Sequence, residues 1–278
     1  MPRESQTPGR PQVMGIVNVT PDSFSDGGRW TSVETAVDRA MRLVAEGADV
    51  LDIGGESTRP GADPVAAGEE IARVVPVIAG LRARWDGPIS IDTMKPEVAR
   101  AAVAAGATMW NDVTALSHSP ESAAVAAELG CHIVLMHMKG EPRTMQADPR
   151  YDDVAQEVRD HLAARAEAAM AAGVARDRIW LDPGIGFGKT AAHNLTLTAR
   201  LEMLTALGFP VLYAASRKRT IQAIDPTATE AADRLGGSLA LALEGARRGA
   251  RMVRVHDVRE TVQALKVQAA VAAAAGHA

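Results

Sequence analysis

The chain of 278 residues contains one cysteine and few aromatic residues: three phenylalanines, two tyrosines and four tryptophans. The single cysteine, Cys131, cannot form a disulfide within the chain, and no Cys-x-x-Cys pair is present to hold a structural metal. Cys131 begins an apolar run, where a cysteine is more often a small buried side chain than a nucleophile. Disulfide scaffolds and zinc-finger folds are therefore excluded.

An excess of positive charge is also missing, because 30 lysines and arginines stand against 34 aspartates and glutamates. The net charge of −4 argues against the basic surface that binds nucleic acids and membranes. No apolar run approaches the length of a transmembrane helix. Residues 1–12 are polar with no apolar stretch behind them, which predicts a flexible tail rather than a signal peptide. We therefore expect a cytoplasmic protein without nucleic-acid or membrane partners, with one domain over residues 13–278.

Short β-rich runs alternate with Ala-rich stretches of helical periodicity throughout this domain. Strands are predicted near Val13–Val17, Asp49–Ile53, Pro88–Ile91, Thr108–Val113, His132–Met136, Arg178–Leu181, Pro210–Ala214 and Arg251–Val255. Glycines follow several helical stretches, in the position where helices commonly end. Eight strands, each followed by a helix, within about 250 residues predict an α/β protein with a single (β/α)₈ TIM barrel. A doubly wound open sheet is the alternative that periodicity alone leaves open.

Polar or charged residues stand at the carboxyl end of every predicted strand. Examples are Asp92 after the third strand, Asn111 in the fourth and Asp182 after the sixth. In a barrel these ends converge on one face, which is where barrels place their active sites. Loop exposure alone explains polar residues, but it does not explain single carboxylates at the point where a strand ends. The pattern therefore favours an active site over an ordinary surface.

Several other catalytic motifs are absent or incomplete. The run Gly184–Thr190 is close to a nucleotide-binding P-loop, but Pro183 stands where that motif requires its first glycine. No Gly-x-Ser-x-Gly nucleophile elbow occurs, and the scattered histidines form no His-Glu-x-x-His zinc site. We therefore expect neither a nucleotide-binding loop of this type, nor an enzyme nucleophile, nor a resident zinc ion.

Eight stretches of the sequence resemble, in order, the motifs of the dihydropteroate synthases. The first two are Asn18–Gly28 and Gly54–Ala62. The others are Ser90–Thr93, Asn111–Val113, Leu135–Gln146, Asp182–Lys189, Ser216–Lys218 and Arg254–Asp257. The resemblance implies a homodimeric (β/α)₈ barrel that joins 6-hydroxymethyl-7,8-dihydropterin diphosphate to 4-aminobenzoate. The products would be 7,8-dihydropteroate and pyrophosphate, and sulfonamides, which mimic 4-aminobenzoate, would inhibit the enzyme.

The resemblance also assigns roles to individual residues. The implied pterin-binding set is Asp92, Asn111, Met136, Asp182, Phe187, Lys218 and Arg254. Asp182 would accept hydrogen bonds from the N–H and NH₂ along one pterin edge, since charge-assisted hydrogen bonds are the stronger ones. Lys218 would donate to the ring carbonyl and a ring nitrogen, and Met136 would lie under the ring. The implied catalytic set is Asp92, Lys218, Arg254 and His256.

Two further subsites are implied for the other reacting groups. The diphosphate would be held by Asn18, Thr58, Arg59, Arg254 and His256. Asn18 would also be the protein contact of a Mg²⁺ cofactor, an ion that commonly keeps water and phosphate oxygens and takes few protein ligands. The 4-aminobenzoate subsite would consist of Phe24, Thr58, Pro60, Phe187, Ser216 and Lys218.

The implied reaction is dissociative: pyrophosphate leaves first, and the aniline nitrogen then attacks a carbocation-like methylene that Asp92 stabilises. Two rival functions remain. A pterin-dependent methyltransferase acting with a corrinoid protein would share the pterin residues, but it has no use for the aminobenzoate and diphosphate residues. A silent pterin-binding paralogue would be expected to have lost some of those residues, and this sequence keeps them.

Overall fold

The computed structural model of the chain describes residues 10–19, 29–57, 63–141 and 144–275. Three residues of the predicted tail, Arg10 to Gln12, belong to the described part of the structure. Residues 1–9 lie outside the described part, but strand β1 already begins at Gln12 and runs over Gln12–Asn18. Arg10 donates from both terminal nitrogens to the carboxylate of Asp49, at 2.7 and 3.0 Å. The chain therefore joins the fold from Arg10 onward.

Strands and helices alternate along the rest of the chain. The other strands are β2 (Val50–Gly54), β3 (Ile89–Asp92), β4 (Met109–Asp112), β5 (His132–Met136), β6 (Ile179–Asp182), β7 (Leu212–Tyr213) and β8 (Met252–Val255). The α-helices are α1 (Arg29–Glu46), α2 (Ala67–Arg82), α3 (Pro96–Ala104), α4 (Ser122–Leu129), α5 (Val154–Ala171), α6 (Ala191–Ala199), α7 (Glu202–Thr205), α8 (Arg219–Ile224), α9 (Leu235–Arg247) and α10 (Val258–Ala275). Among the described residues, no helix is long and apolar enough to cross a membrane.

Helix boundaries follow local signals in the sequence. Asp153 caps α5, since its carboxylate accepts hydrogen bonds from two backbone amides of the first turn. Thr190 and His193 form a reciprocal capping box at the start of α6. Gly130 ends α4 in the left-handed conformation at φ 59°, which a residue without a side chain adopts readily. Local chemistry thus sets where several of the connecting loops begin and end.

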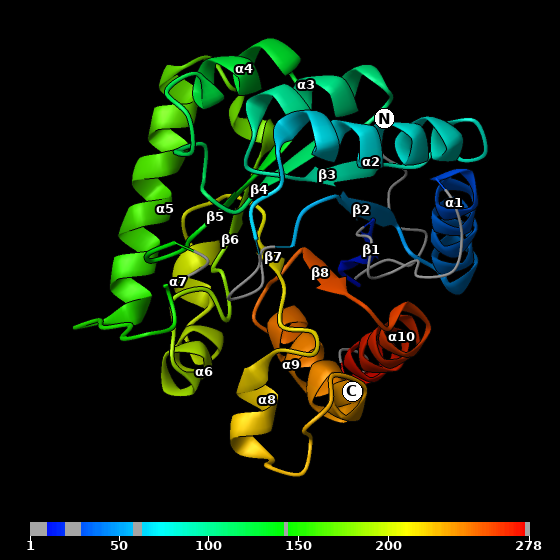
Figure 1. Cartoon of the computed structure of the whole chain (residues 1–278). Helices are drawn as coiled ribbons and strands as arrows, with labels where there is room; N and C mark the ends of the chain where they lie inside the picture. The colour runs from blue at the N-terminus through cyan, green and yellow to red at the C-terminus, as the bar shows by residue number, and fades with distance from the viewer. Residues whose placement is uncertain (1–9, 20–28, 58–62, 142–143, 276–278) are drawn as a thin grey trace.

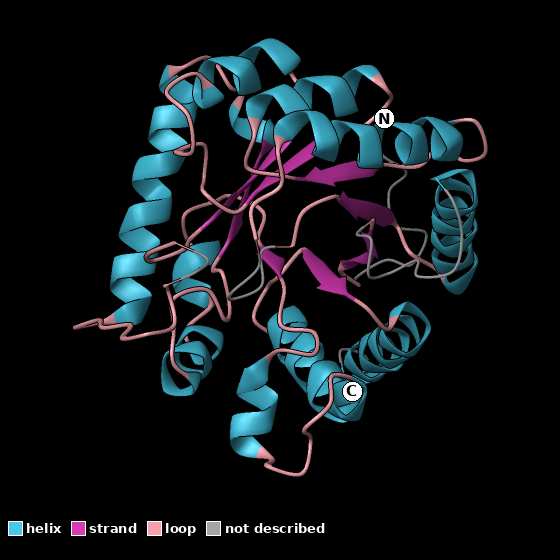
Figure 2. Ribbon diagram, in the orientation of Figure 1, coloured by secondary structure: helices cyan, strands magenta, loops and turns pink. Residues whose placement is uncertain are grey.

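The strands are parallel and pair in the order β6-β5-β4-β3-β2-β1-β8-β7. The two outer strands of this order meet through a parallel bridge between Leu181 and Val211, which closes the sheet. Figures 1 and 2 show the strands at the centre of the molecule with the helices around them. The predicted (β/α)₈ barrel is confirmed, and the doubly wound alternative is excluded because neighbouring strands follow chain order around a closed ring.

The barrel interior is layered. One apolar layer is formed by Met14, Val50, Met109, Val134, Leu212, Ala214 and Met252, with Trp180 packed against it. Side chains on one face of a strand repeat every second residue. Two residues further along their strands, the same face presents Asp52, Asn111, Met136, Asp182 and Arg254. A largely polar set of side chains therefore lies directly above an apolar floor.

Candidate active site

A hollow opens at the carboxyl ends of the strands. It is lined by Asp92, Asn111, Val113, Met136, Asp182, Gly184, Ile185, Phe187, Ala214, Lys218 and Arg254. These residues come from β3, β4, β5, β6 and β8 and from the loops that follow β4, β6 and β7. The structure thus brings together in one hollow all seven residues that the sequence predicts for the pterin. The ligand of the hollow is inferred below.

Arg254 lies between two carboxylates at the inner end of this hollow, above the apolar layer. Its Nε donates to Asp52 Oδ2 at 2.5 Å, and a terminal nitrogen donates to Asp92 Oδ2 at 2.7 Å. Asn111 Nδ2 also donates to Asp52 Oδ2, at 3.3 Å. The second oxygens of both aspartates are buried and have no hydrogen-bond partner among the described residues. Such acceptors are costly unless a ligand or another donor satisfies them.

Asp52 is the site residue that sequence reasoning missed. Its side chain is fully buried and faces the barrel interior from the middle of β2. The signal was present, because a carboxylate inside an otherwise apolar strand needs a partner when it is buried. That partner, Arg254, is 202 residues away in the sequence, and only the pairing of β8 with β1 and β1 with β2 brings them together.

Burial shifts the proton affinities of the acidic groups. It raises the pKa of Asp92 to about 7, against the opposing effect of Arg254. It raises the pKa of Asp182 to about 6, against the hydrogen bond that the Gly184 amide donates to Asp182 Oδ1 at 2.7 Å. Both carboxylates are therefore poised to gain stability from a ligand that donates hydrogen bonds to their charged forms.

The loops after β6 and β7 meet over the hollow. Lys218 Nζ lies 4.2 Å from the centroid of the Phe187 ring, a cation–π contact. Arg217 stands beside Lys218 with φ 58° and is held by Asp257, whose Oδ2 accepts from Arg217 Nε at 3.0 Å. This unusual backbone conformation for a residue with a side chain is thus fixed by an ion pair to the loop after β8.

Ser216 and His256 lie next to the hollow rather than in its lining. Ser216 Oγ is 3.1 Å from His256 Nδ1 and accepts from the His256 backbone amide at 3.2 Å. Burial lowers the pKa of His256 to about 3, and the nearby charges of Arg254 and Arg217 act in the same direction. The imidazole is therefore neutral at neutral pH. The two residues predicted for different ligand groups are here direct neighbours.

Asn18 ends β1 in register with Gly54, which in turn pairs with Asp92 on β3. Within the described ranges, no group of three or more His, Cys, Asp or Glu side chains could hold a metal ion. An amide oxygen is a hard ligand that Mg²⁺ accepts. The donors present fit a Mg²⁺ that brings most of its ligands with a diphosphate, and they do not form a closed metal centre.

Four predicted residues, Phe24, Thr58, Arg59 and Pro60, lie outside the described residues. Cys131, whose environment the sequence left open, is buried, and burial raises the pKa of its thiol to about 11. This makes it a poor nucleophile at neutral pH.

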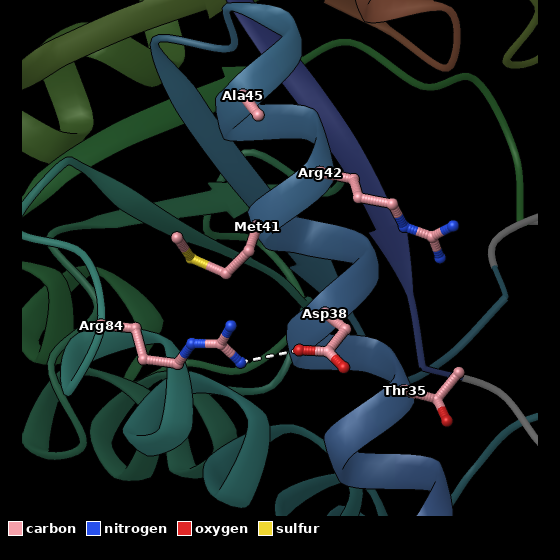
Figure 3. A pocket seen from close by; sticks show the side chains of 6 residues that line it. All are labelled: Thr35, Asp38, Met41, Arg42, Ala45 and Arg84. Atoms are coloured by element: carbon pink, nitrogen blue, oxygen red, sulfur yellow. Dashed lines mark hydrogen bonds and ion pairs between the residues drawn. The ribbon is translucent and has the colours of Figure 1, made fainter.

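A second hollow lies on the outside of the molecule, along α1 and beside the turn that follows α2 (Figure 3). Its lining consists of Thr35, Asp38, Met41, Arg42, Ala45 and Arg84. Asp38 and Arg84 form an exposed ion pair across it at 2.7 Å. No residue of its lining stands at a strand end, and its one carboxylate, that of Asp38, is already paired with Arg84. The chemistry of the molecule is therefore concentrated at the barrel mouth.

The sequence matches the family of pterin binding enzymes over residues 14–256. The dihydropteroate synthase of Escherichia coli (strain K12) is 47% identical over 258 residues, which cover 92% of this chain and 90% of that protein. The dihydropteroate synthase of Streptococcus pyogenes is 46% identical over 259 residues, with coverage of 93% and 95%.

Solved structures give the same result. Dihydropteroate synthase of Xanthomonas albilineans with 4-aminobenzoic acid is 54% identical, with a TM-score of 0.89 and coverage of 95% of this chain and 94% of that chain. The X. albilineans enzyme in complex with 7,8-dihydropteroate has a TM-score of 0.86 at 51% identity, covering 96% and 95%. The Yersinia pestis enzyme with a sulfonamide drug has a TM-score of 0.89 at 44% identity, covering 95% of each chain.

Proposed function

The chain belongs to the dihydropteroate synthase family of pterin-binding enzymes, and we propose that the hollow at its barrel mouth holds the pterin of 6-hydroxymethyl-7,8-dihydropterin diphosphate. Enzymes of this family are transferases that join this diphosphate to 4-aminobenzoate and release pyrophosphate. The observation that carries the proposal is the convergence of Asp92, Asn111, Asp182, Lys218 and Arg254 on one enclosed hollow.

The hydrogen-bonding groups of a pterin match those of the hollow. Asp182 is buried and offers carboxylate oxygens to the donors along one pterin edge. Asn111 and Asp92 complete the ring contacts, and Lys218 donates to the ring carbonyl and nitrogen. Met136 lies in the lining and supports the ring from one side. A ligand lacking these groups would leave buried polar atoms unpaired, so the hollow selects strongly for a pterin.

The diphosphate is proposed to lie beside Arg254, His256 and Asn18, with Thr58 and Arg59 assigned by resemblance alone. A Mg²⁺ ion, when bound here, would supply positive charge to stabilise the leaving group. Asn18 offers it one amide oxygen from the end of β1. The guanidinium of Arg254 and the neutral imidazole of His256 provide hydrogen-bond donors for the phosphate oxygens.

The proposed reaction proceeds by loss of pyrophosphate before the new bond forms. The bond between the methylene carbon and the diphosphate oxygen breaks, and its electron pair leaves with pyrophosphate. The electron-rich pterin and the carboxylate of Asp92 then stabilise the positive methylene carbon. The amine of 4-aminobenzoate attacks that carbon and afterwards loses one proton to solvent. Phe187, Ser216 and Lys218 are proposed to hold the 4-aminobenzoate, together with Phe24, Thr58 and Pro60.

We also propose that the chain works as a homodimer in the cytoplasm. Val267 and Val271 on α10 are 60% and 65% exposed, which is unusual for large apolar side chains. A second copy would give these side chains an apolar partner.

The test is a turnover assay with purified protein, Mg²⁺, the dihydropterin diphosphate and 4-aminobenzoate. We expect pyrophosphate and dihydropteroate in equal amounts, dependent on both substrates, reduced by a sulfonamide and lost with a chelator. Product formation that persists unchanged in the chelator would refute the Mg²⁺ proposal alone. Tight binding of the pterin diphosphate without any product would instead favour a silent paralogue.

A further inference from the structure

A buried lysine with no assigned role lies directly behind the hollow. Lys189 lies in the loop between β6 and α6 (residues 183–190, the β6 loop), and only 3% of its surface is exposed. Its Nζ is 2.9 Å from the backbone oxygen of Phe187, 3.0 Å from that of Gly184 and 3.1 Å from that of His137. It is also 2.9 Å from His137 Nδ1. Four acceptors from two separate loops thus surround one ammonium group.

The ammonium form of Lys189 suits these carbonyl groups, because it can donate to all three. Three backbone oxygens that face a common point carry partial negative charges, which repel one another in a buried setting. The imidazole of His137 is neutral, since burial and then Lys189 lower its pKa to about 2, so its nitrogen can act as an acceptor. Burial lowers the pKa of Lys189 to about 7, while Asp182 opposes that shift. Hydrogen bonds to these acceptors likewise favour the charged lysine.

The two loops that Lys189 joins pack backbone against backbone. A Cβ atom at Gly184 would lie 1.9 Å from the carbonyl oxygen of His137, and one at Gly188 would lie 2.2 Å from that of Lys139. Both glycines have positive φ values, of 66° and 62°. No side chain fits between the loops at these points. Gln146 and Tyr151 donate to the backbone oxygens of Gly186 and Gly188 across the same contact, at 2.6 and 2.8 Å, and Lys189 is the buried cationic group that joins the two loops.

Two of the residues that Lys189 binds, Gly184 and Phe187, themselves line the hollow. The amide of Gly184 donates to Asp182 Oδ1 at 2.7 Å, and the ring of Phe187 lies under Lys218 Nζ. The ammonium group is therefore linked by two hydrogen bonds to the carboxylate that faces the pterin edge. It also fixes the backbone of the residue whose ring contacts Lys218.

We propose that Lys189 is a positioning residue: a built-in cation that clamps the β6 loop against the β5 loop and so holds Asp182 and Phe187 in place for the pterin. This inference rests on the proposed function of the hollow. It differs from the roles assigned above because Lys189 does not line the hollow. A displacement of about 1 Å at a reacting group can cost on the order of a hundredfold in rate.

Lys189→Met tests the clamp, because methionine keeps most of the length and apolar volume but removes the charge and the donors. We expect the Kd for the dihydropterin diphosphate, measured by calorimetry, to rise at least about tenfold, and kcat/KM to fall by at least as much. Circular dichroism and thermal unfolding report whether the variant folds. Lys189→Gln, which keeps two N–H donors without the charge, should lie between the wild type and the methionine variant.

Lys139→Met is the matched control. Lys139 belongs to the neighbouring loop and also donates to a backbone oxygen, that of Arg150 at 2.6 Å, but its side chain is 48% exposed. Its substitution should leave Kd and kcat/KM unchanged. A further variant, Lys189→Ala, should regain activity with n-propylammonium, which replaces the missing atoms, and gain less from neutral 1-propanol.

The outcomes separate the two proposals. A wild-type chain that does not bind the pterin diphosphate would refute the proposed function itself. A folded Lys189→Met or Lys189→Gln variant with wild-type Kd and kcat/KM would overturn the clamp. If neither variant folds, Lys189 serves the stability of the core and the positioning role is wrong.

Discussion

At the scale of single residues, the barrel mouth depends on one arginine shared between two aspartates. Arg254 donates to Asp52 and Asp92, and Asp52 is completely buried. A buried ion pair of this kind fixes geometry more than it adds stability. Asp52 therefore matters because it aims the Arg254 guanidinium, even though the lining of the hollow does not include it.

We expect Asp52→Asn to reduce kcat/KM by about tenfold or more, because the neutral amide no longer holds the guanidinium and a loss of about 1.4 kcal/mol in the transition state is tenfold in rate. Steady-state kinetics with both substrates would measure this. The matched control is Asp49→Asn, directly before the same strand, where the carboxylate binds Arg10. That change should lower the melting temperature and leave kcat/KM intact. Equal kinetic losses in the two variants would argue against an aiming role for Asp52.

At the scale of elements, three charged side chains tie the β2 loop to two helices. Lys95, which precedes α3, donates to Glu70 of α2 at 2.6 Å and also to Glu56 just after β2. Glu56 Oε1 accepts from the backbone amide of Val65 at 3.3 Å. The cluster therefore contacts the chain both just after β2 and just before α2. Glu70 is fully buried, and its Oε1 has no partner among the described residues.

We expect Lys95→Met to destabilise the fold by about 3–5 kcal/mol, because it leaves two carboxylates unpaired in a poorly hydrated place. Urea unfolding would measure this loss. Adding Glu70→Gln to Lys95→Met should recover part of it by removing one of the unpaired charges. Arg100→Met provides the comparison, since Arg100 pairs with Glu128 between α3 and α4 with both side chains exposed, and its loss should destabilise the fold far less. A similar loss of unfolding free energy in the Lys95 and Arg100 variants would mean that the buried cluster does not stabilise the fold more than an exposed ion pair does.

The elements themselves were predictable to different degrees. All eight strands were expected from β-rich runs, but β7 is only Leu212–Tyr213, because the chain pairs with β8 over two residues and then turns toward the hollow. Gly130 and Gly208 marked the ends of helical stretches at α4 and α7, but the bounds of the short helices α6, α7 and α8 were not predicted. Helices of one or two turns carry too few apolar repeats to stand out, and packing against the barrel stabilises them.

At the scale of the whole molecule, the limits of sequence reasoning follow from what only the closed barrel brings together. The residues that line the hollow could be predicted as a group because each stands in a motif near a strand end. Asp52 was visible only as a carboxylate in an apolar strand, since its partner lies across the barrel, and the contacts of Lys189 form only where two loops pack. Burial and contact between distant segments determine what such residues do, and local sequence patterns reveal neither.

The strands of the barrel are not joined equally well, and the most weakly joined pair, β6 and β7, lies beside the hollow. Between β6 and β7 there is a single bridge, with the Leu181 amide donating to Pro210 oxygen at 3.0 Å. The Leu51 amide makes the same kind of bond to Pro88 oxygen at 3.1 Å, but it lies in the fully registered ladder between β2 and β3. Asp182 ends β6, and Lys218 follows β7, so a bound pterin would connect the two sides of the weaker seam.

Hydrogen exchange can compare these two amides directly. In the free protein the Leu181 amide should exchange at least about tenfold faster than the Leu51 amide, which corresponds to ~1.4 kcal/mol less for local opening. The dihydropterin diphosphate should slow Leu181 more than Leu51, because the ligand contacts both sides of the seam. Equal slowing of the two amides would indicate that the ligand stabilises the barrel as a whole. The contact between β6 and β7 would then break only when the whole barrel unfolds. Substrate binding would not depend on the strength of that contact.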